Sequence, residues 1–177
     1  MRLRDMQEFA IFDFDGTITN LRVDWDLLKK NLSITRISEI WNLQDHERQI
    51  AFDQVSDFEV KGITLELLID RNIFHYFKQI AVLTNNSEET VNRFFDNLTK
   101  DRIINPPVLV VGRETLQGPK EDQEIFGSAI KLIFNAMNIS SPENCVYVGD
   151  QEYELHYAKK IGLNAIGISK FHKYYEG

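Results

Sequence analysis

The chain has a single cysteine, Cys145, so it cannot form an internal disulfide, and this favours a reducing compartment. The N-terminus lacks the long apolar core of a signal peptide, and no segment approaches the roughly 20 apolar residues of a membrane span. We therefore expect a cytoplasmic protein with no membrane partner. Cys145 itself lies in an apolar run, where we expect a small buried side chain rather than a nucleophile.

Positive charge is also scarce, since 20 Lys and Arg residues face 27 Asp and Glu residues, for a net charge of −7. This balance argues against nucleic acid as the main partner. It suits an anionic substrate only where a metal ion or a few placed cations reverse the local field. The length of 177 residues fits one compact domain with room for a small inserted subdomain.

Five short apolar runs have the character of strands. They are Phe9–Phe14, Ile80–Leu83, Val108–Val111, Val146–Val148 and Ala165–Ile168. The runs are nearly continuous rather than alternating, as in strands buried on both faces of a parallel sheet. Helical patterns separate the later runs, at Ser87–Leu98, Ile125–Met137 and Tyr153–Ile161. The sequence therefore predicts an α/β fold with a doubly wound parallel sheet, on which the aromatic segment Phe171–Tyr175 is expected to pack.

Residues 20–77 interrupt this alternation, because they contain no convincing strand. Helical patterns are predicted at Trp25–Leu32, Ile37–Val55 and Leu65–Phe77. The segment is too long for a simple crossover, so we interpret residues 20–77 as a helical subdomain inserted into a core of residues 1–19 and 78–177. Its aromatic residues are expected to form its own core; they are Trp25, Trp41 and Phe52.

Two aspartates, Asp13 and Asp15, follow the first strand and share one face of it. Like charges this close are costly unless a cation lies between them or one carboxyl stays protonated. A plain polar turn is an alternative interpretation. An EF-hand loop is excluded, because an apolar strand precedes the pair and no series of acidic ligands follows at Ile18, Asn20 and Leu21.

Other polar residues follow the later strands, where ligands bind in sheets of this kind. Thr84 and Asn85 follow the second strand just before a helix, whose free N–H groups suit an anion. Lys120 stands in a turn before the next long helix, and Asp150 ends the fourth strand, with Glu154 four residues later. Each signal is weak alone. Together they supply a nucleophile, oxygen ligands for a hard metal ion and donors for phosphoryl oxygens, as phosphoryl transfer requires.

At this point the sequence resembles the haloacid dehalogenase-like hydrolases over nearly its whole length. The first family motif is matched without departure by Asp13-Phe14-Asp15-Gly16-Thr17, and the second by Thr84. The lysine motif is present in Lys120–Phe126 without its two prolines, and the fourth motif in Gly149–Glu154 with glutamate in the last place. The helix ending Ala158–Gly162 is also similar. The inserted segment then looks like the family's helical cap.

The resemblance implies a phosphatase of small phosphorylated metabolites. Asp13 would attack phosphorus to form an aspartyl-phosphate. Asp15 would protonate the leaving oxygen and later deprotonate the hydrolytic water. Thr84 and the backbone N–H of Asn85 would bind phosphoryl oxygens, and Lys120 would offset their charge.

The resemblance further implies Mg²⁺ as a cofactor, held by Asp13, the backbone carbonyl of Asp15 and Asp150. The extra methylene of Glu154 changes its reach, so we favour a place beside the metal ligands rather than direct coordination. Substrate selectivity is expected from the cap, where Arg22 is the candidate contact because it lies close to the catalytic loop.

Several alternatives stay open. A phosphomutase has the same core, although a small cap favours hydrolysis. A receiver-like signalling domain would need an aspartate at the end of the third strand, where this chain has Gly112-Arg113. A non-catalytic phosphate-binding protein is disfavoured by the intact set of Asp13, Asp15, Thr84, Lys120 and Asp150. A dehalogenase is disfavoured by the presence of Asp15.

Overall fold

The central feature of the molecule is a five-stranded parallel sheet with strand order β3-β2-β1-β4-β5. The structure, a computed structural model, describes residues 7–100 and 104–175. The strands are β1 (Phe9–Phe12), β2 (Gln79–Leu83), β3 (Leu109–Val111), β4 (Cys145–Gly149) and β5 (Asn164–Gly167). Phe12 lies opposite Val82 on β2 and Val148 on β4, so the three central strands end side by side. The predicted fold class is confirmed.

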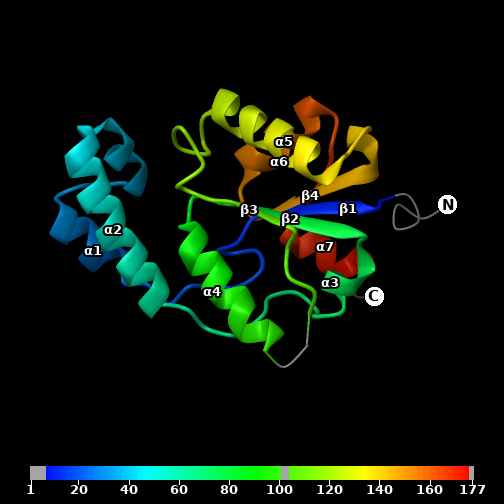
Figure 1. The fold of residues 1–177 in the computed structure, drawn as a ribbon, viewed down its shortest axis with the longest axis horizontal. Helices are drawn as coiled ribbons and strands as arrows, with labels where there is room; N and C mark the ends of the chain where they lie inside the picture. Colours follow the sequence, from blue (N-terminus) through cyan, green and yellow to red (C-terminus); the bar gives the residue numbers. More distant parts are fainter. Residues whose placement is uncertain (1–6, 101–103, 176–177) are drawn as a thin grey trace.

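Helices cover both faces of the sheet (Figure 1). One face carries α3 (Ile73–Tyr76), α4 (Glu88–Thr99) and α7 (Ile168–Tyr175). The other carries α5 (Gln123–Met137) and α6 (Glu152–Ile161), with the short 3₁₀ helix η3 (Pro142–Asn144) before β4. Among the described residues, no helix is both long and apolar enough to cross a membrane.

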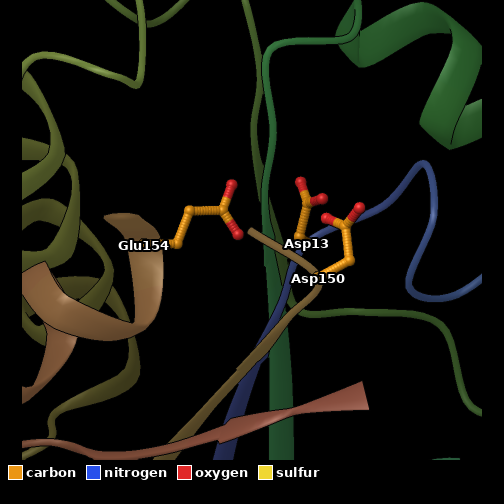
Figure 2. A group of neighbouring side chains, drawn as sticks. All are labelled: Asp13, Asp150 and Glu154. Carbon is orange, nitrogen blue, oxygen red and sulfur yellow. The ribbon is translucent and has the colours of Figure 1, made fainter. Parts of the chain in front are cut away.

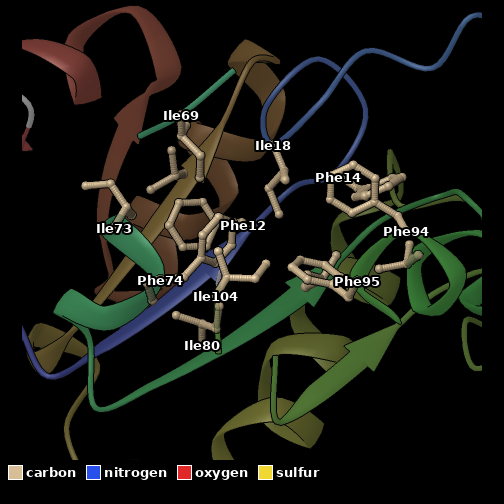
Figure 3. Packing of buried hydrophobic residues seen from close by; sticks show 14 of the residues in the cluster. Phe12, Phe14, Ile18, Ile69, Ile73, Phe74, Ile80, Phe94, Phe95 and Ile104 are labelled. Atoms are coloured by element: carbon tan, nitrogen blue, oxygen red, sulfur yellow. The ribbon is translucent and has the colours of Figure 1, made fainter. Parts of the chain in front are cut away.

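Alternation along β1 places successive side chains in different halves of the core. Ile11 packs in the cluster beneath α5 and α6, whereas Phe12 packs in the opposite cluster. Figure 3 shows Phe12 beside Phe74, and the centres of these rings lie 6.4 Å apart. The ring centre of Phe171 lies 5.7 Å from that of Phe12 in an edge-to-face arrangement. Both faces of the strand are therefore buried, which explains its continuous apolar sequence.

Several local predictions differ from the structure. The first strand ends at Phe12 rather than Phe14, because the chain turns at Asp13. The last strand ends at Gly167, and Ile168 begins α7, a helix that the sequence analysis did not predict. Phe171 on α7 packs against the core as expected. The helix predicted over Leu65–Phe77 is wrong over most of its length, since only Ile73–Tyr76 is helical.

The cap consists of α1 (Trp25–Leu32), the 3₁₀ helix η2 (Ile37–Asn42) and α2 (Asp45–Lys61). The single helix predicted over Ile37–Val55 is therefore two elements. Figure 1 shows α1 and α2 beside the sheet, at the end of the molecule away from the N-terminus. The cap has its own small core, formed by Leu28, Ile40, Ala51 and Val55.

The two segments that connect the cap to the core, at residues 22–23 and at Gly62, lie against each other. The amide of Arg22 donates to the carbonyl of Gly62 (2.8 Å). A Cβ at Gly62 would lie 2.8 Å from the Val23 side chain, so the close approach requires glycine. After Gly62 the chain runs under the sheet, where Ile69 and Phe77 are buried in the same cluster as Phe12. The division into a core of residues 1–19 and 78–177 and a cap of residues 20–77 stays a prediction.

Candidate active site

Asp13 and Asp15 lie in the turn that follows β1. The amide of Asp13 donates to the carbonyl of Val148 on β4 (2.9 Å), which ties the end of β1 to its neighbour. The carboxylate of Asp15 accepts a hydrogen bond from the amide of Leu21 (2.8 Å). Burial raises the pKa of Asp15 from 3.8 to about 6, a change that the Leu21 hydrogen bond opposes and the nearby carboxylate of Asp13 reinforces. Folding therefore favours the protonated form of Asp15.

The turn itself is fixed by its backbone. The carbonyl of Phe14 accepts a hydrogen bond from the amide of Ile18 (2.9 Å). Gly16 has a φ of +82°, and a Cβ there would lie 2.8 Å from a carboxylate oxygen of Asp150. Only glycine combines this conformation with this clearance. The turn therefore brings the first and fourth motifs into direct contact.

Lys120 is the central cation of the site, and its side chain is 2% exposed. Its Nζ donates to Oδ1 of Asp13 (2.5 Å) and to the carbonyl of Leu83 (3.3 Å), and pairs with Oε1 of Glu154 (2.5 Å). Burial alone would lower the pKa of Lys120, but the two carboxylates outweigh it and raise this pKa above its ordinary value. The backbone N–H of Lys120 donates to Oδ1 of Asn85 (2.9 Å). Lys120 is therefore held as an ammonium between two acids.

Three carboxylates, from the ends of β1 and β4 and the first turn of α6, gather at one place. Asp13, Asp150 and Glu154 each offer one oxygen, and these oxygens lie within 4.8 Å of one another (Figure 2). Asp150 is exposed and accepts from the side chain of Gln151 (2.7 Å), whereas Glu154 is buried and accepts from the hydroxyl of Tyr153 (3.2 Å). Burial raises the pKa of Glu154 to about 7, although Lys120 acts in the opposite direction.

Thr84 and Asn85 follow β2 on the other side of Asp13. The hydroxyl of Thr84 is buried and donates to Oδ1 of Asn86 (2.8 Å). The side chain of Asn85 donates to Glu121 (3.0 Å) and, through its oxygen, accepts from the amide of Lys120. The loop after β2 is thereby joined to the loop before α5, so that both line the same site.

One cavity of about 280 Å³ contains these groups. Seven of the residues selected from the sequence line it: Asp13, Asp15, Thr84, Asn85, Lys120, Asp150 and Glu154. The other lining residues are Trp25, Ile37, Glu59, Asn86, Arg113, Glu121, Gln151 and Tyr153. Trp25 was expected only in the cap core, but it also faces this cavity. Cap and core therefore enclose the site together.

The structure does not bring Arg22 into the cavity lining. Its side chain is 77% exposed and lies 3.7 Å from the carboxylate of Glu66. Closeness in sequence to the catalytic loop was its only support.

Sequence analysis missed a buried ion pair between Glu59 on α2 and Arg113 after β3. Nη1 and Nη2 of Arg113 each lie 3.1 Å from an oxygen of Glu59, and the two side chains are 1% and 4% exposed. Glu59 also accepts from the side chain of Asn86 and the amide of Ser87 (both 3.0 Å). The guanidinium of Arg113 lies 5.0 Å from the ring centre of Phe52. The pair fastens the cap to the loop that follows β2.

Two sequence signals could have singled out these two residues, although not their pairing. Glu59 continues the buried stripe of Ala51 and Val55 at a spacing of four residues, which puts an acid on the apolar face of α2. Arg113 stands at the carboxyl end of a parallel strand, where ligand-binding residues gather. The predicted helix stopped at Val55, one turn before Glu59, whereas α2 continues to Lys61.

The comparisons with known proteins agree with this architecture. The structure resembles a predicted phosphoglycolate phosphatase from Haemophilus somnus (TM-score 0.61, 15% identity), with 92% of this chain and 85% of that chain covered. It also resembles CbbY from Rhodobacter sphaeroides, solved in complex with phosphate (TM-score 0.57, 16% identity, 92% and 86% covered). A phosphonoacetaldehyde hydrolase-like protein from Oleispira antarctica has a TM-score of 0.65 at 10% identity, with 94% and 74% covered.

At these identities the three structures support the fold alone. Searching proteins of curated function finds no match. A family model described as "Haloacid dehalogenase-like hydrolase" matches residues 26–168, most of the chain. The match begins after the two aspartates, which the structure places at the end of β1. The chain therefore belongs to the haloacid dehalogenase-like hydrolases.

Proposed function

We propose that the protein is a Mg²⁺-dependent phosphatase of small phosphorylated metabolites that works through an aspartyl-phosphate on Asp13. The observation that supports this most strongly is the ammonium of Lys120, held 2.5 Å from the Asp13 carboxylate in a cavity that Asp15 also lines. A buried carboxylate with a cation on one oxygen has its other oxygen available for attack. The neighbouring acid with a raised pKa supplies the proton.

The proposed reaction has two displacements at phosphorus. An oxygen of Asp13 bonds to phosphorus while the bond to the ester oxygen breaks, and Asp15 gives its proton to that oxygen, so the alcohol leaves. Asp15 then takes a proton from water, and the water oxygen bonds to phosphorus while the bond to Asp13 breaks. Inorganic phosphate leaves, and both aspartates return to their starting states.

Residues around Asp13 would bind the phosphoryl oxygens. Thr84 lines the cavity, and its hydroxyl can turn from Asn86 toward a bound oxygen. The backbone N–H of Asn85 is the second donor in this proposal. Lys120 offsets the negative charge that the phosphoryl group shares with Asp13 in the transition state.

The acidic cluster fits a hard divalent cation, because its three carboxylate oxygens lie within 4.8 Å of one another and the single ammonium of Lys120 offsets only part of their charge. We propose Asp13, Asp150 and the backbone carbonyl of Asp15 as the ligands of Mg²⁺. Glu154 is the partner of Lys120, so we assign it to positioning that lysine. When bound, Mg²⁺ supplies charge neutralisation between the phosphoryl group and these carboxylates.

Release of phosphate from p-nitrophenyl phosphate tests this function. With Mg²⁺, the wild-type protein should release p-nitrophenolate and phosphate in equal amounts, and Asp13→Asn should be inactive. Glu152→Gln is the matched control, because this exposed acid lies near the site but outside the cavity lining. Wild-type inactivity over a broad panel of phosphomonoesters, or normal turnover by Asp13→Asn, would contradict the proposal. Binding of phosphate compounds without turnover would favour the non-catalytic alternative.

A further inference from the structure

The cavity contains far more negative than positive charge. Two of its lining residues are cations, Lys120 and Arg113. Six are carboxylates: Asp13, Asp15, Glu59, Glu121, Asp150 and Glu154. The charge of the proposed Mg²⁺ is used by its carboxylate ligands and by the transferring phosphoryl group. The positive charge available to the rest of a substrate therefore depends on whether either of these two side-chain cations is free.

The ammonium group of Lys120 already has a partner for each of its N–H donors. Its three N–H donors meet Asp13, Glu154 and the carbonyl of Leu83. In the proposed reaction its charge is used by the transferring phosphoryl group. No charge from Lys120 is left for a second anion elsewhere in the substrate.

Arg113 is also occupied. Its Nη1 donates to Glu59 and to the carbonyl of Asn85 (3.1 Å each), and its Nη2 donates to Glu59 (3.1 Å) and to the hydroxyl of Ser56 (2.8 Å). The remaining N–H, on Nε, is buried without a hydrogen-bond partner among the described residues. Glu59 cancels the charge of Arg113, so this cation cannot attract an anionic group.

The N-terminus of α4 is the other place where an anion could bind, and carboxylates already occupy it. Glu59 accepts the amide of Ser87 (3.0 Å), and Glu114 accepts the amide of Glu88 (2.7 Å). The hydroxyl of Ser87 accepts the amide of Thr90 (3.1 Å). These N–H donors of the helix are satisfied by the protein itself.

The part of the cavity left for the organic portion of a substrate is neutral or acidic. Trp25, Ile37 and Tyr153 supply uncharged surface, and Glu121 supplies a carboxylate. Arg36, next to Ile37 in sequence, is outside the lining and lies 3.8 Å from Glu39. A carboxylate or second phosphate in this space would face carboxylates without a free side-chain cation.

We propose that the substrate is a phosphomonoester whose organic portion carries no negative charge. This inference rests on the proposed phosphatase function and narrows it to esters of neutral or cationic alcohols. The juxtaposition that supports it is the Glu59–Arg113 pair, which removes the one cation that could have bound a second anion. An ammonium in the organic portion would be accepted by Glu121 and the aromatic rings.

Three esters of similar size separate the possibilities: phosphoethanolamine, n-propyl phosphate and phosphoglycolate, whose organic portions are cationic, neutral and anionic. With Mg²⁺, we expect kcat/KM for phosphoglycolate to be lower than for phosphoethanolamine by about tenfold or more, equivalent to about 1.4 kcal/mol. Preference for phosphoglycolate over both other esters would overturn this inference alone. Inactivity toward all three and toward p-nitrophenyl phosphate would overturn the proposed function, and this inference with it.

A variant of Glu59 tests the role of the ion pair directly. Glu59→Gln keeps the size of the side chain but leaves the charge of Arg113 uncancelled. The ratio of kcat/KM for phosphoglycolate to that for phosphoethanolamine should then rise by about tenfold over the wild-type ratio. Using ratios removes differences in intrinsic reactivity between the esters.

Glu47→Gln is the matched control, because it removes the same charge from an exposed position on the same helix and should leave the ratio unchanged. An unchanged ratio in folded Glu59→Gln would contradict the role of the pair. If Glu59→Gln does not fold by circular dichroism, the wild-type comparison of the three esters still decides the inference.

Discussion

Glu59 on the cap helix α2 and Arg113 after β3 form a two-pronged ion pair, with both nitrogen–oxygen distances at 3.1 Å and both side chains almost fully buried. They are 54 positions apart in the chain, so the contact exists only in the folded protein. The pair lines the cavity of the candidate active site. It couples the position of the cap to the loop that is proposed to bind phosphate.

Removing one partner of this pair should be strongly destabilising. Arg113→Met leaves the carboxylate of Glu59 buried without its counter-charge. We therefore expect the free energy of unfolding to fall by about 3–5 kcal/mol. Urea unfolding followed by circular dichroism measures this loss. Arg93→Met is the control: Arg93 forms an exposed pair with Glu89 (2.6 Å), so its loss should cost at most about 0.5 kcal/mol. Equal costs for the two variants would show that the buried pair has no special role.

Asp15→Asn should lower the catalytic rate without destabilising the protein. Asparagine cannot protonate a leaving group, so turnover of an alkyl phosphate, a poor leaving group, should fall by about 10²–10⁴-fold. Steady-state phosphate release measures this, with Glu152→Gln as the control for an acid lost near the site. A near-normal rate would reject Asp15 as the general acid and base.

The same variant should be more stable than the wild type in metal-free buffer near neutral pH. The pKa of Asp15 is raised by burial from 3.8 to about 6 in the folded protein, so folding favours its protonated form. The contribution of protonated Asp15 to the free energy of unfolding is fully present below about pH 4 and is lost as the pH rises through about 6. Asparagine stays neutral, so we expect a gain of about 1–3 kcal/mol at about pH 7 that shrinks toward pH 4. Urea unfolding in EDTA at both pH values decides this, and a variant less stable at neutral pH would refute it.

Mg²⁺ should raise the melting temperature of the wild-type protein. A cation that binds only the folded state at a hundredfold excess over its Kd adds about 2.7 kcal/mol of stability. Asp150→Asn should lose most of this shift because it removes a proposed ligand, whereas Glu152→Gln, at an exposed acid two positions later, should keep it. An equal shift in all three proteins would place the cation elsewhere.

The sequence was sufficient for much of the fold and the centre of the site. Continuous apolar strands and their polar ends are local patterns, and the parallel sheet forces residues such as Asp13 and Asp150 to one edge. The segment 65–77 was predicted wrongly because its apolar residues pack under the sheet mainly as extended chain and turns. A buried helix and a buried extended segment are both rich in apolar residues. The spacing of the apolar residues in segment 65–77 therefore did not distinguish the two structures.

The Glu59–Arg113 pair depends on how the cap meets the core, which no local pattern determines. Arg22 shows the converse: its position near the motif suggested a contact, but its side chain points to Glu66 at the surface. Charges on the cap can be assigned to a site only when the packing of α2 on the core is known.

The most direct test of the central claim is to detect a phosphoryl group on Asp13. The nitrophenolate ion leaves without protonation, so Asp15→Asn should still form the aspartyl-phosphate from p-nitrophenyl phosphate. Hydrolysis of this intermediate lacks its base, so the intermediate should accumulate. Acid quenching and peptide mass spectrometry should then find phosphoryl on Asp13, with a burst of nitrophenolate stoichiometric with enzyme. Turnover by the wild type with neither a burst nor a phosphorylated Asp13 peptide in the variant would contradict the account.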